Sequence, residues 1–185
     1  VAYSHIAAAQ DASPASESSS PSEGDPAPID VVPLNVDEGA LLLNGDWSFK
    51  YIPALSAGAD EAFYQPDFSV TTWASIPVPA NWEIHGFAEP HYYMDLQDGL
   101  GLYRRPFQVP AEWKDRVIYL RFEGVAYAFQ VWVNGKQAGT SNASAFNPNI
   151  FDITSFLNSD SGADNLLAVR VTTKPVAWQS DVNDD

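Results

Sequence analysis

Apolar and polar residues alternate at every second position over most of the chain after residue 41, and this pattern limits the fold more than any other feature. In residues 116–123, the side chains of Ile118, Leu120 and Phe122 fall on one side of an extended backbone. A period of two fits a strand with one buried face and does not fit an amphipathic helix, whose apolar period is about 3.6 residues. We therefore predict a strand in this segment.

The same alternation recurs in other short segments that are separated by Gly, Pro and Asn. They are residues 46–51, 73–78, 102–109, 126–134, 149–153 and 164–172. Asn134-Gly135 supplies the positive φ angles of a tight hairpin turn. Only single helical turns are expected, at residues 110–115 and 154–158. This series of short strands with turn-rich connections predicts an all-β fold, a two-sheet antiparallel jelly-roll sandwich.

The beginning of the chain has a different composition. The 185 residues carry a net charge of −15, yet no Lys or Arg precedes Lys50, and residues 11–38 consist mainly of Ser, Pro, Ala and acidic residues. Such a composition buries too little apolar surface to fold by itself. We predict a leader and a flexible acidic linker over residues 1–38 and one domain over residues 39–185. The run Ala7-Ala8-Ala9 resembles the end of a secretory signal, so a secreted or periplasmic location is expected.

Composition also argues against several classes of function. Without cysteine the chain cannot use a catalytic thiol or a thiolate metal site. Its acidic balance makes nucleic acid an unexpected partner, and no apolar run is long enough to predict a membrane span. No cofactor is expected. A structural calcium ion stays a possibility, because residues with the oxygen ligands that calcium prefers occur in two places, shortly before residue 99 and at the end of the chain. These candidates are Asp95, Asp98, Asp181, Asn183, Asp184 and Asp185.

Six groups of short motifs follow one another along the chain. They are Leu43-Asn44-Gly45-Asp46-Trp47-Ser48-Phe49; Pro77-Val78-Pro79-Ala80-Asn81-Trp82-Glu83 with His85-Gly86; Leu102-Tyr103-Arg104-Arg105-Pro106-Phe107; Arg121-Phe122-Glu123-Gly124-Val125 with Val131-Trp132-Val133-Asn134-Gly135 and Gly139; Phe151-Asp152-Ile153-Thr154; and Asn165-Leu166-Leu167-Ala168-Val169. In this order they resemble the N-terminal sugar-binding domain of glycoside hydrolase family 2, the family of β-galactosidases, β-glucuronidases and β-mannosidases. The resemblance covers the chain from about residue 41 to its end and implies a jelly roll of the galactose-binding-domain type.

Most side chains of these motifs are expected to build the scaffold. Trp47 and Phe49 share a strand face and should pack between the sheets. Arg104 and Arg105 alternate faces, so one of them is expected to pair with a buried acid such as Glu123 while the other meets solvent.

The resemblance implies a division of labour between domains. In this family the catalytic glutamates belong to a downstream (β/α)₈ barrel, which is absent from this chain. The chain is therefore expected to be a non-catalytic carbohydrate-binding or scaffold module of a β-galactosidase-like enzyme, and the fragment is not expected to be active alone. Its partners would be a β-galactoside or related glycoside and the downstream barrel. A stand-alone carbohydrate-binding module or lectin-like domain, and a purely structural domain, are the alternatives.

In this family the N-terminal domain contributes loops to the edge of the substrate pocket, and here these correspond to residues 90–99 and 174–185. Carboxylates that accept sugar hydroxyl groups beside a stacking aromatic ring are the usual means of recognising a neutral sugar. The sugar stays open, because Met94 stands where galactosidases of the family carry Asn. The predicted sugar-binding residues are Tyr92, Asp95, Asp98, Trp178, Asp181 and Asp184.

Overall fold

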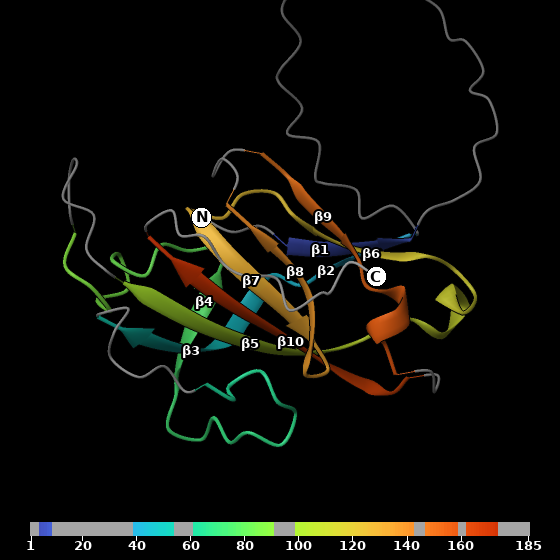
Figure 1. The fold of residues 1–185 in the computed structure, drawn as a ribbon, viewed down its shortest axis with the longest axis horizontal. Coiled ribbons are helices and arrows are strands. Elements are labelled where there is room, and N and C mark those ends of the chain that lie inside the picture. Colours follow the sequence, from blue (N-terminus) through green and yellow to red (C-terminus); the bar gives the residue numbers. More distant parts are fainter. Residues whose placement is uncertain are drawn as a thin grey trace, which may run out of the picture.

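A computed structural model describes residues 4–8, 39–53, 61–90, 99–142, 147–158 and 162–173, and its strands form two antiparallel sheets (Figure 1). The smaller sheet has the order β2-β1-β6-β9, and the larger has the order β4-β3-β5-β10-β7-β8. The strands are β1 (Ser4–Ala8), β2 (Ala40–Leu42), β3 (Gly45–Ile52), β4 (Ala74–Val78), β5 (Leu100–Gln108), β6 (Ile118–Phe122), β7 (Ala128–Val133), β8 (Lys136–Ser141), β9 (Asn149–Asp152) and β10 (Asp164–Thr172).

These strands confirm the predicted all-β fold, a two-sheet antiparallel jelly-roll sandwich, and every predicted strand is found to within two residues of its expected ends. The two expected helical turns are the 3₁₀ turns η1 (Ala111–Trp113) and η2 (Thr154–Phe156). In the described parts of the chain, no helix is long and apolar enough to cross a membrane.

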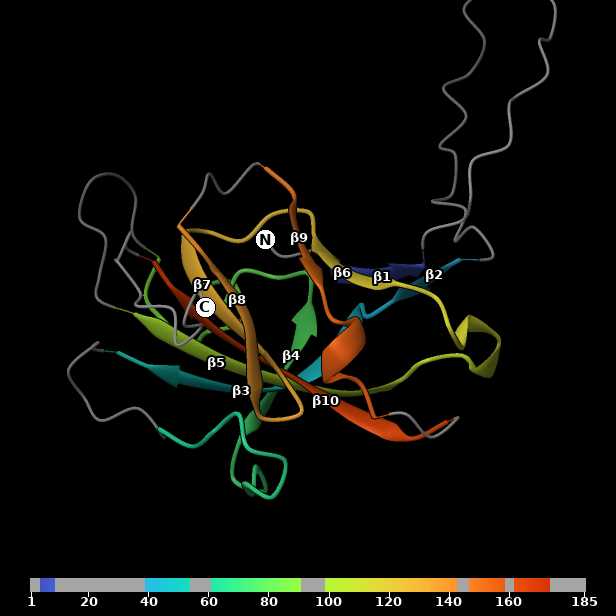
Figure 2. The ribbon, with the colours of Figure 1, turned by 45° about the vertical axis from the view of Figure 1, so that its right-hand side comes forward.

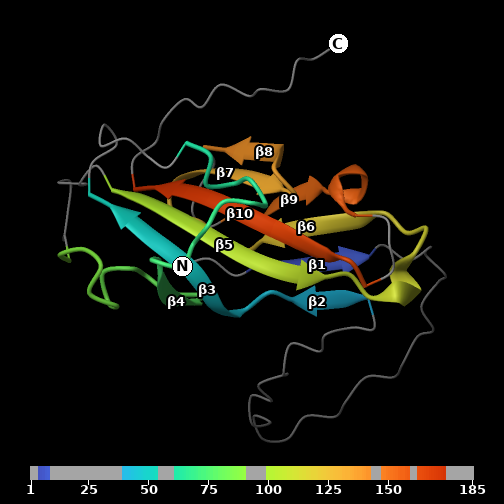
Figure 3. The same ribbon diagram turned by 90° about the horizontal axis from the view of Figure 1, so that it is seen from below.

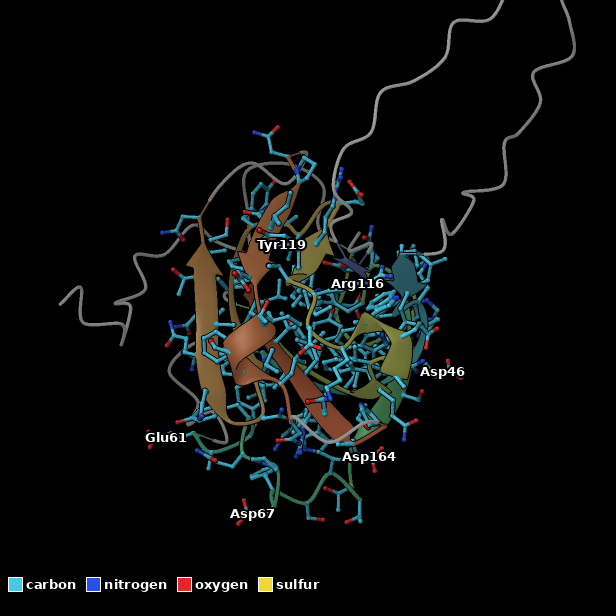
Figure 4. The ribbon with its side chains drawn as sticks, turned by 90° about the vertical axis from the view of Figure 1, so that its right-hand side faces the viewer. Asp46, Glu61, Asp67, Arg116, Tyr119 and Asp164 are labelled. Atoms are coloured by element: carbon cyan, nitrogen blue, oxygen red, sulfur yellow. The ribbon has the colours of Figure 1, made fainter. Side chains whose placement is uncertain are left out.

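The main core lies between the two sheets, which Figures 2 and 3 show as separate layers. Alternation along β6 buries Ile118, Leu120 and Phe122, as the period of two predicted. Trp47 and Phe49 are also buried in this core, which confirms their expected position. Figure 4 shows side chains filling the space between the layers, while labelled acids such as Asp46 lie at the periphery.

A second apolar cluster covers the outer face of the larger sheet, which the sequence alone did not predict. Phe63 is fully buried there, and the ring of Tyr64 stacks on Trp132 with centroids 4.9 Å apart and planes 7° from parallel. Trp73 stacks on Phe63 from the same segment. Because residues 61–73 supply this cover, every residue of β7 is buried, although its sequence alternates.

The expected pairing of Arg104 or Arg105 with Glu123 is wrong. Glu123 instead pairs with Arg121, two residues earlier in the chain, with 2.9 Å between Nε and Oε1. Arg104 lies on the outer face of β5, where Nη1 donates a hydrogen bond of 2.5 Å to the carbonyl of Phe68. Arg105 donates to the carbonyl of Asp46. Both guanidinium groups therefore donate hydrogen bonds to backbone carbonyl groups of neighbouring segments and do not pair with Glu123.

Strand β1 differs from the predicted organisation, in which residues 1–38 lie outside the domain. Its five residues form the second strand of the smaller sheet and pair with both β2 and β6. The segment His5–Ala8 carries no charge beyond its histidine, so its backbone can join a sheet without burying an acid. The rest of the predicted leader and linker between β1 and β2, residues 9–38, lies outside the described residues.

The predicted hairpin turn at Asn134-Gly135 is confirmed, with φ angles of 52° and 82°. The Asn134 side chain also ties this turn to the rest of the sandwich. Its Nδ2 donates to the carbonyl of Phe156 at 2.9 Å, and its Oδ1 accepts from the amide of Leu166 at 2.8 Å. The turn thereby fixes the register of the edge strand β8, whose small and polar sequence gives no apolar signal of its own.

The two sheets meet along one side through Gly139 of β8 and Phe151 of β9. A Cβ atom on Gly139 would lie 2.4 Å from two ring carbons of Phe151, far inside van der Waals contact. The Phe151 ring in turn packs edge-on against Phe122 and Phe129 of the core. Glycine is therefore needed here for a close approach of ring and backbone.

We predict that Gly139→Ala lowers the free energy of unfolding by about 1–3 kcal/mol, because the added methyl group displaces the Phe151 ring. Urea unfolding at 25 °C measures this loss. In a Phe151→Leu background the same substitution should cost clearly less, since the obstructing ring is gone. Equal costs in the two backgrounds would show that this contact does not set the requirement for glycine.

Candidate functional site

Strands β5 and β10 bring the two predicted sugar-contacting segments to one end of the sandwich. They pair antiparallel from Gln108 opposite Asp164 to Leu100 opposite Thr172. One residue further on, the Gly99 amide donates to Thr173 Oγ1 and the Thr173 amide donates to the Gly99 carbonyl, each at 3.4 Å. We call this the Gly99 end of the sandwich. In Figure 1 it lies on the left, where β3 and β10 end and β5 begins.

One predicted segment ends at Gly99 and the other starts after Thr173, and these two residues lie beside each other. A joint role of the two segments in one site requires this proximity. The predicted sugar-binding residues themselves lie outside the described residues, and so do the calcium candidates. The six predicted sugar-binding residues concerned are Tyr92, Asp95, Asp98, Trp178, Asp181 and Asp184.

Gly99, directly before β5, and Gly101 within it let aromatic rings lie directly on the backbone at this end. A Cβ atom on Gly99 would be 2.8 Å from the Tyr51 hydroxyl, and one on Gly101 would be 2.4 Å from the ring of Trp82. The centroids of the Tyr51 and Trp82 rings are 5.4 Å apart. These side chains were not among the predicted site residues. The spacing of Gly99 and Gly101 was an available signal, since glycines at i and i+2 of a strand clear one face for a close neighbour.

The turn that carries Trp82 is held by its own backbone. The amides of His85 and Phe87 both donate to the Trp82 carbonyl, at 3.2 and 3.1 Å, and the Gly86 amide donates to the Glu83 carbonyl at 3.1 Å. Trp82 itself is buried and stacks near Phe49 of the core. The turn therefore presents Glu83 and its neighbours in a fixed position at the Gly99 end.

A cavity of about 210 Å³ lies between the two sheets, and we call it the inter-sheet cavity. It extends from Thr173 at the Gly99 end to Trp47 and Val78, which lie toward the opposite end of the larger sheet. Its walls are mostly aromatic and aliphatic, with a few polar groups. The lining residues are Trp47, Val78, Ala80, Asn81, Trp82, Glu83, Tyr103, Phe122, Val125, Ala126, Tyr127, Val169, Val171 and Thr173. Among the described residues, the lining includes one carboxylate and no Lys or Arg.

Burial and a nearby negative charge act together on two phenol groups of this end. Burial is the main cause that raises the pKa of Tyr103 well above its usual range, and the charge of Glu83 adds to the shift. The pKa of Tyr51 is raised by the same two causes in the same order. The local environment therefore disfavours a second negative charge.

The described residues contain no group of three or more His, Asp or Glu side chains that could hold a metal ion. The structural calcium ion considered above stays a prediction, because its candidate ligands lie in residues 91–98 and 181–185, outside the described residues.

Comparison with known proteins relates most of the chain to one family. The family model described as the sugar-binding domain of family 2 glycosyl hydrolases matches residues 41–184. A β-galactosidase of Priestia megaterium is 36% identical over 146 residues, which are 70% of this chain and 14% of that protein. A β-galactosidase of Clostridium acetobutylicum is 32% identical over 170 residues, which are 82% of this chain and 18% of that protein. The chain therefore spans less than a fifth of the length of these two curated relatives.

Solved structures show the same sandwich in larger proteins. A β-glucuronidase of Bacteroides uniformis superposes with a TM-score of 0.56 and 30% identity, covering 71% of this chain and 14% of that one. A β-glucuronidase of Ruminococcus gnavus in complex with D-glucuronic acid gives a TM-score of 0.55 and 25% identity, covering 70% and 21%.

We predict that Tyr103→Phe makes stability less sensitive to alkaline pH. The folded chain keeps this phenol protonated while the unfolded chain loses the proton near pH 10, so the stabilisation is complete below that pH and is lost as the pH rises. Above pH 10, the free energy of unfolding of the unsubstituted chain should fall about 1.4 kcal/mol per pH unit more steeply than that of the variant.

Urea unfolding between pH 7 and pH 11.5 measures both curves. Below pH 9 the difference between the two proteins should be constant, because the phenol is protonated in both states, and this range is the internal control. Parallel curves above pH 10 would contradict the assigned burial of Tyr103.

Proposed function

The chain belongs to the sugar-binding domain family of the family 2 glycosyl hydrolases, and from this premise we propose that it is the non-catalytic, carbohydrate-contacting module of a β-galactosidase-like enzyme. The observation that carries the proposal is the joint origin of residues 90–99 and 174–185 at the Gly99 end. Two segments that adjoin neighbouring residues can contact the same ligand. Segments at opposite ends of the sandwich could not.

In this proposal Asp95, Asp98, Asp181 and Asp184 accept sugar hydroxyl groups, and Tyr92 and Trp178 supply apolar faces for the sugar ring. The turn of Trp82 and the two hydrogen bonds between Gly99 and Thr173 hold the described neighbours of both segments in place. The scaffold thus limits the positions that these side chains can reach.

We assign catalysis to a part of the enzyme outside this chain. Glycoside hydrolysis requires a pair of carboxyl groups about 5–10 Å apart on either side of the scissile bond. The chain matches 14% and 18% of the length of the two β-galactosidases named above, which leaves ample room in them for a separate catalytic barrel. The barrel is then the direct partner of this module. Export to a secreted or periplasmic location stays a prediction.

Among glycosides, we infer a preference for a neutral sugar over a uronate. Glu83 acts on Tyr51 at the Gly99 end, and the described lining of the inter-sheet cavity includes no Lys or Arg that would attract a carboxylate. Similarity to β-galactosidases in sequence agrees with this inference. The structural similarity to β-glucuronidases lies in the sandwich, which is common to both groups of enzymes.

We predict that methyl β-galactoside binds weakly to the isolated chain and that methyl β-glucuronide binds at least several-fold more weakly. Titration up to about 100 mM followed by backbone amide NMR covers affinities of about 2–4 kcal/mol. The largest shifts should fall on residues 90–99 and 174–185 and on their neighbours Gly99 and Thr173.

Asp95→Asn and Asp181→Asn should each weaken the galactoside at least threefold. Asp46→Asn is the matched control, because Asp46 is exposed and lies at the start of β3, away from the Gly99 end. Shifts confined to another face, no binding at this concentration, or a preference for the glucuronide would overturn the proposal. Binding tighter than millimolar would favour the alternative of a stand-alone carbohydrate-binding module.

A further inference from the structure

The inter-sheet cavity is not needed for sugar contact by residues 90–99 and 174–185, and its own walls could hold a ligand. Both sheets form its walls, with Trp47 from β3 and Tyr103 from β5 on one side and Phe122 from β6 on the other. Its volume of about 210 Å³ exceeds that of engineered apolar cavities of roughly 150 Å³ that admit a benzene ring. A single ring with a short side chain therefore fits it.

The walls suit a flat apolar group. Trp47, Trp82 and Phe122 are each at most 5% exposed, so their ring faces are held in place by the core. Trp47 and Tyr103 meet edge to face with centroids 6.4 Å apart. Such fixed rings offer faces and edges to another aromatic group and attract a cation through their quadrupoles. A hexose is a poorer match, because hydroxyl groups surround its ring and few polar groups line the cavity.

One wall of the cavity carries a negative charge. Glu83 is half-buried there, and the part of the lining that the structure describes contains no Lys or Arg to neutralise it. Its charge is felt by the phenol groups of Tyr51 and Tyr103, whose pKa values it helps to raise. A ligand that enters beside this carboxylate is therefore favoured when it carries a positive charge and disfavoured when it carries a negative one.

We propose that the inter-sheet cavity binds a small aromatic amine, with its ring between the walls formed by Trp47, Trp82 and Phe122 and its ammonium group beside Glu83. The site uses side chains of the sandwich and none of the six predicted sugar-binding residues, and Glu83 is the one residue whose charge both proposals use. The aspartate substitutions therefore test the sugar contact, and the substitutions at Ala80 test the cavity.

Three compounds with the same phenyl ring test the proposal: 2-phenylethylamine, 2-phenylethanol and 3-phenylpropionate. Each is titrated into the whole chain at low ionic strength and followed by NMR. The amine should bind tightest, the alcohol less tightly and the carboxylate about tenfold or more weaker than the amine. Added salt should reduce the difference between the charged compounds, because it screens a partly exposed charge.

Two variants separate the charge from the cavity. Glu83→Gln should abolish the advantage of the amine and leave the affinity for the alcohol unchanged within about twofold. Ala80→Phe projects a ring from the half-buried wall and should weaken all three compounds at least tenfold, and Ala80→Leu provides a smaller filling if the larger one prevents folding. Glu112→Gln is the control, since it removes an exposed carboxylate from η1, after the far end of β5.

Thermal unfolding of each variant confirms that it is folded before affinities are compared. The proposal is overturned if none of the compounds binds, if the carboxylate binds as well as the amine, or if Glu83→Gln leaves their ratio unchanged. It is also overturned if a folded cavity-filling variant binds all three compounds as the unsubstituted chain does.

Discussion

The antiparallel pairing of β5 with β10 is the contact on which the rest of the structure depends. Nine residues of each strand are in register at the centre of the larger sheet, from Asp164 opposite Gln108 to Thr172 opposite Leu100. The pairing places Gly99 beside Thr173, and it thereby sets where both segments of the proposed sugar site begin. A shift by one residue would move every side chain of a strand to the other face and would exchange the contents of the two cores.

Burial on both faces explains why this central sheet can carry a site at its end. Leu102 and Ala168 face the cluster under residues 61–73, while Tyr103 and Val169 face the core between the sheets. A strand that is packed on both sides has little freedom to bend, and this limits the movement of the groups at its ends. Arg104 adds to this by fastening the outer segment through the Phe68 carbonyl.

The sequence predicted the features that local patterns determine and missed those that depend on contacts across the fold. Strong alternation located the strands of the core, and the Asn134-Gly135 pair located the hairpin. β8 has no apolar pattern and was recognisable only through its partner across that turn. One of Arg104 and Arg105 was predicted to pair with an acid, since a sequence does not show that the carbonyl groups of Pro66 and Phe68 lie within reach of Arg104. For the site, the two segments were identified from motif order. The cavity and the place of Glu83 in its lining were not predicted, because they form only when both sheets come together.

The chain is similar to enzymes that are named for different sugars, and this bears on which part of the module could distinguish between sugars. The chain resembles β-galactosidases in sequence and β-glucuronidases in structure, and in each case most of the matched length is the sandwich. A scaffold that is common to enzymes of both names cannot by itself select the sugar. In the function proposed above, any selection by this module therefore comes from the groups that the scaffold positions at the Gly99 end. The charge of Glu83 belongs to the rigid turn of Trp82, so it acts on every ligand at this end, whatever the neighbouring segments contribute.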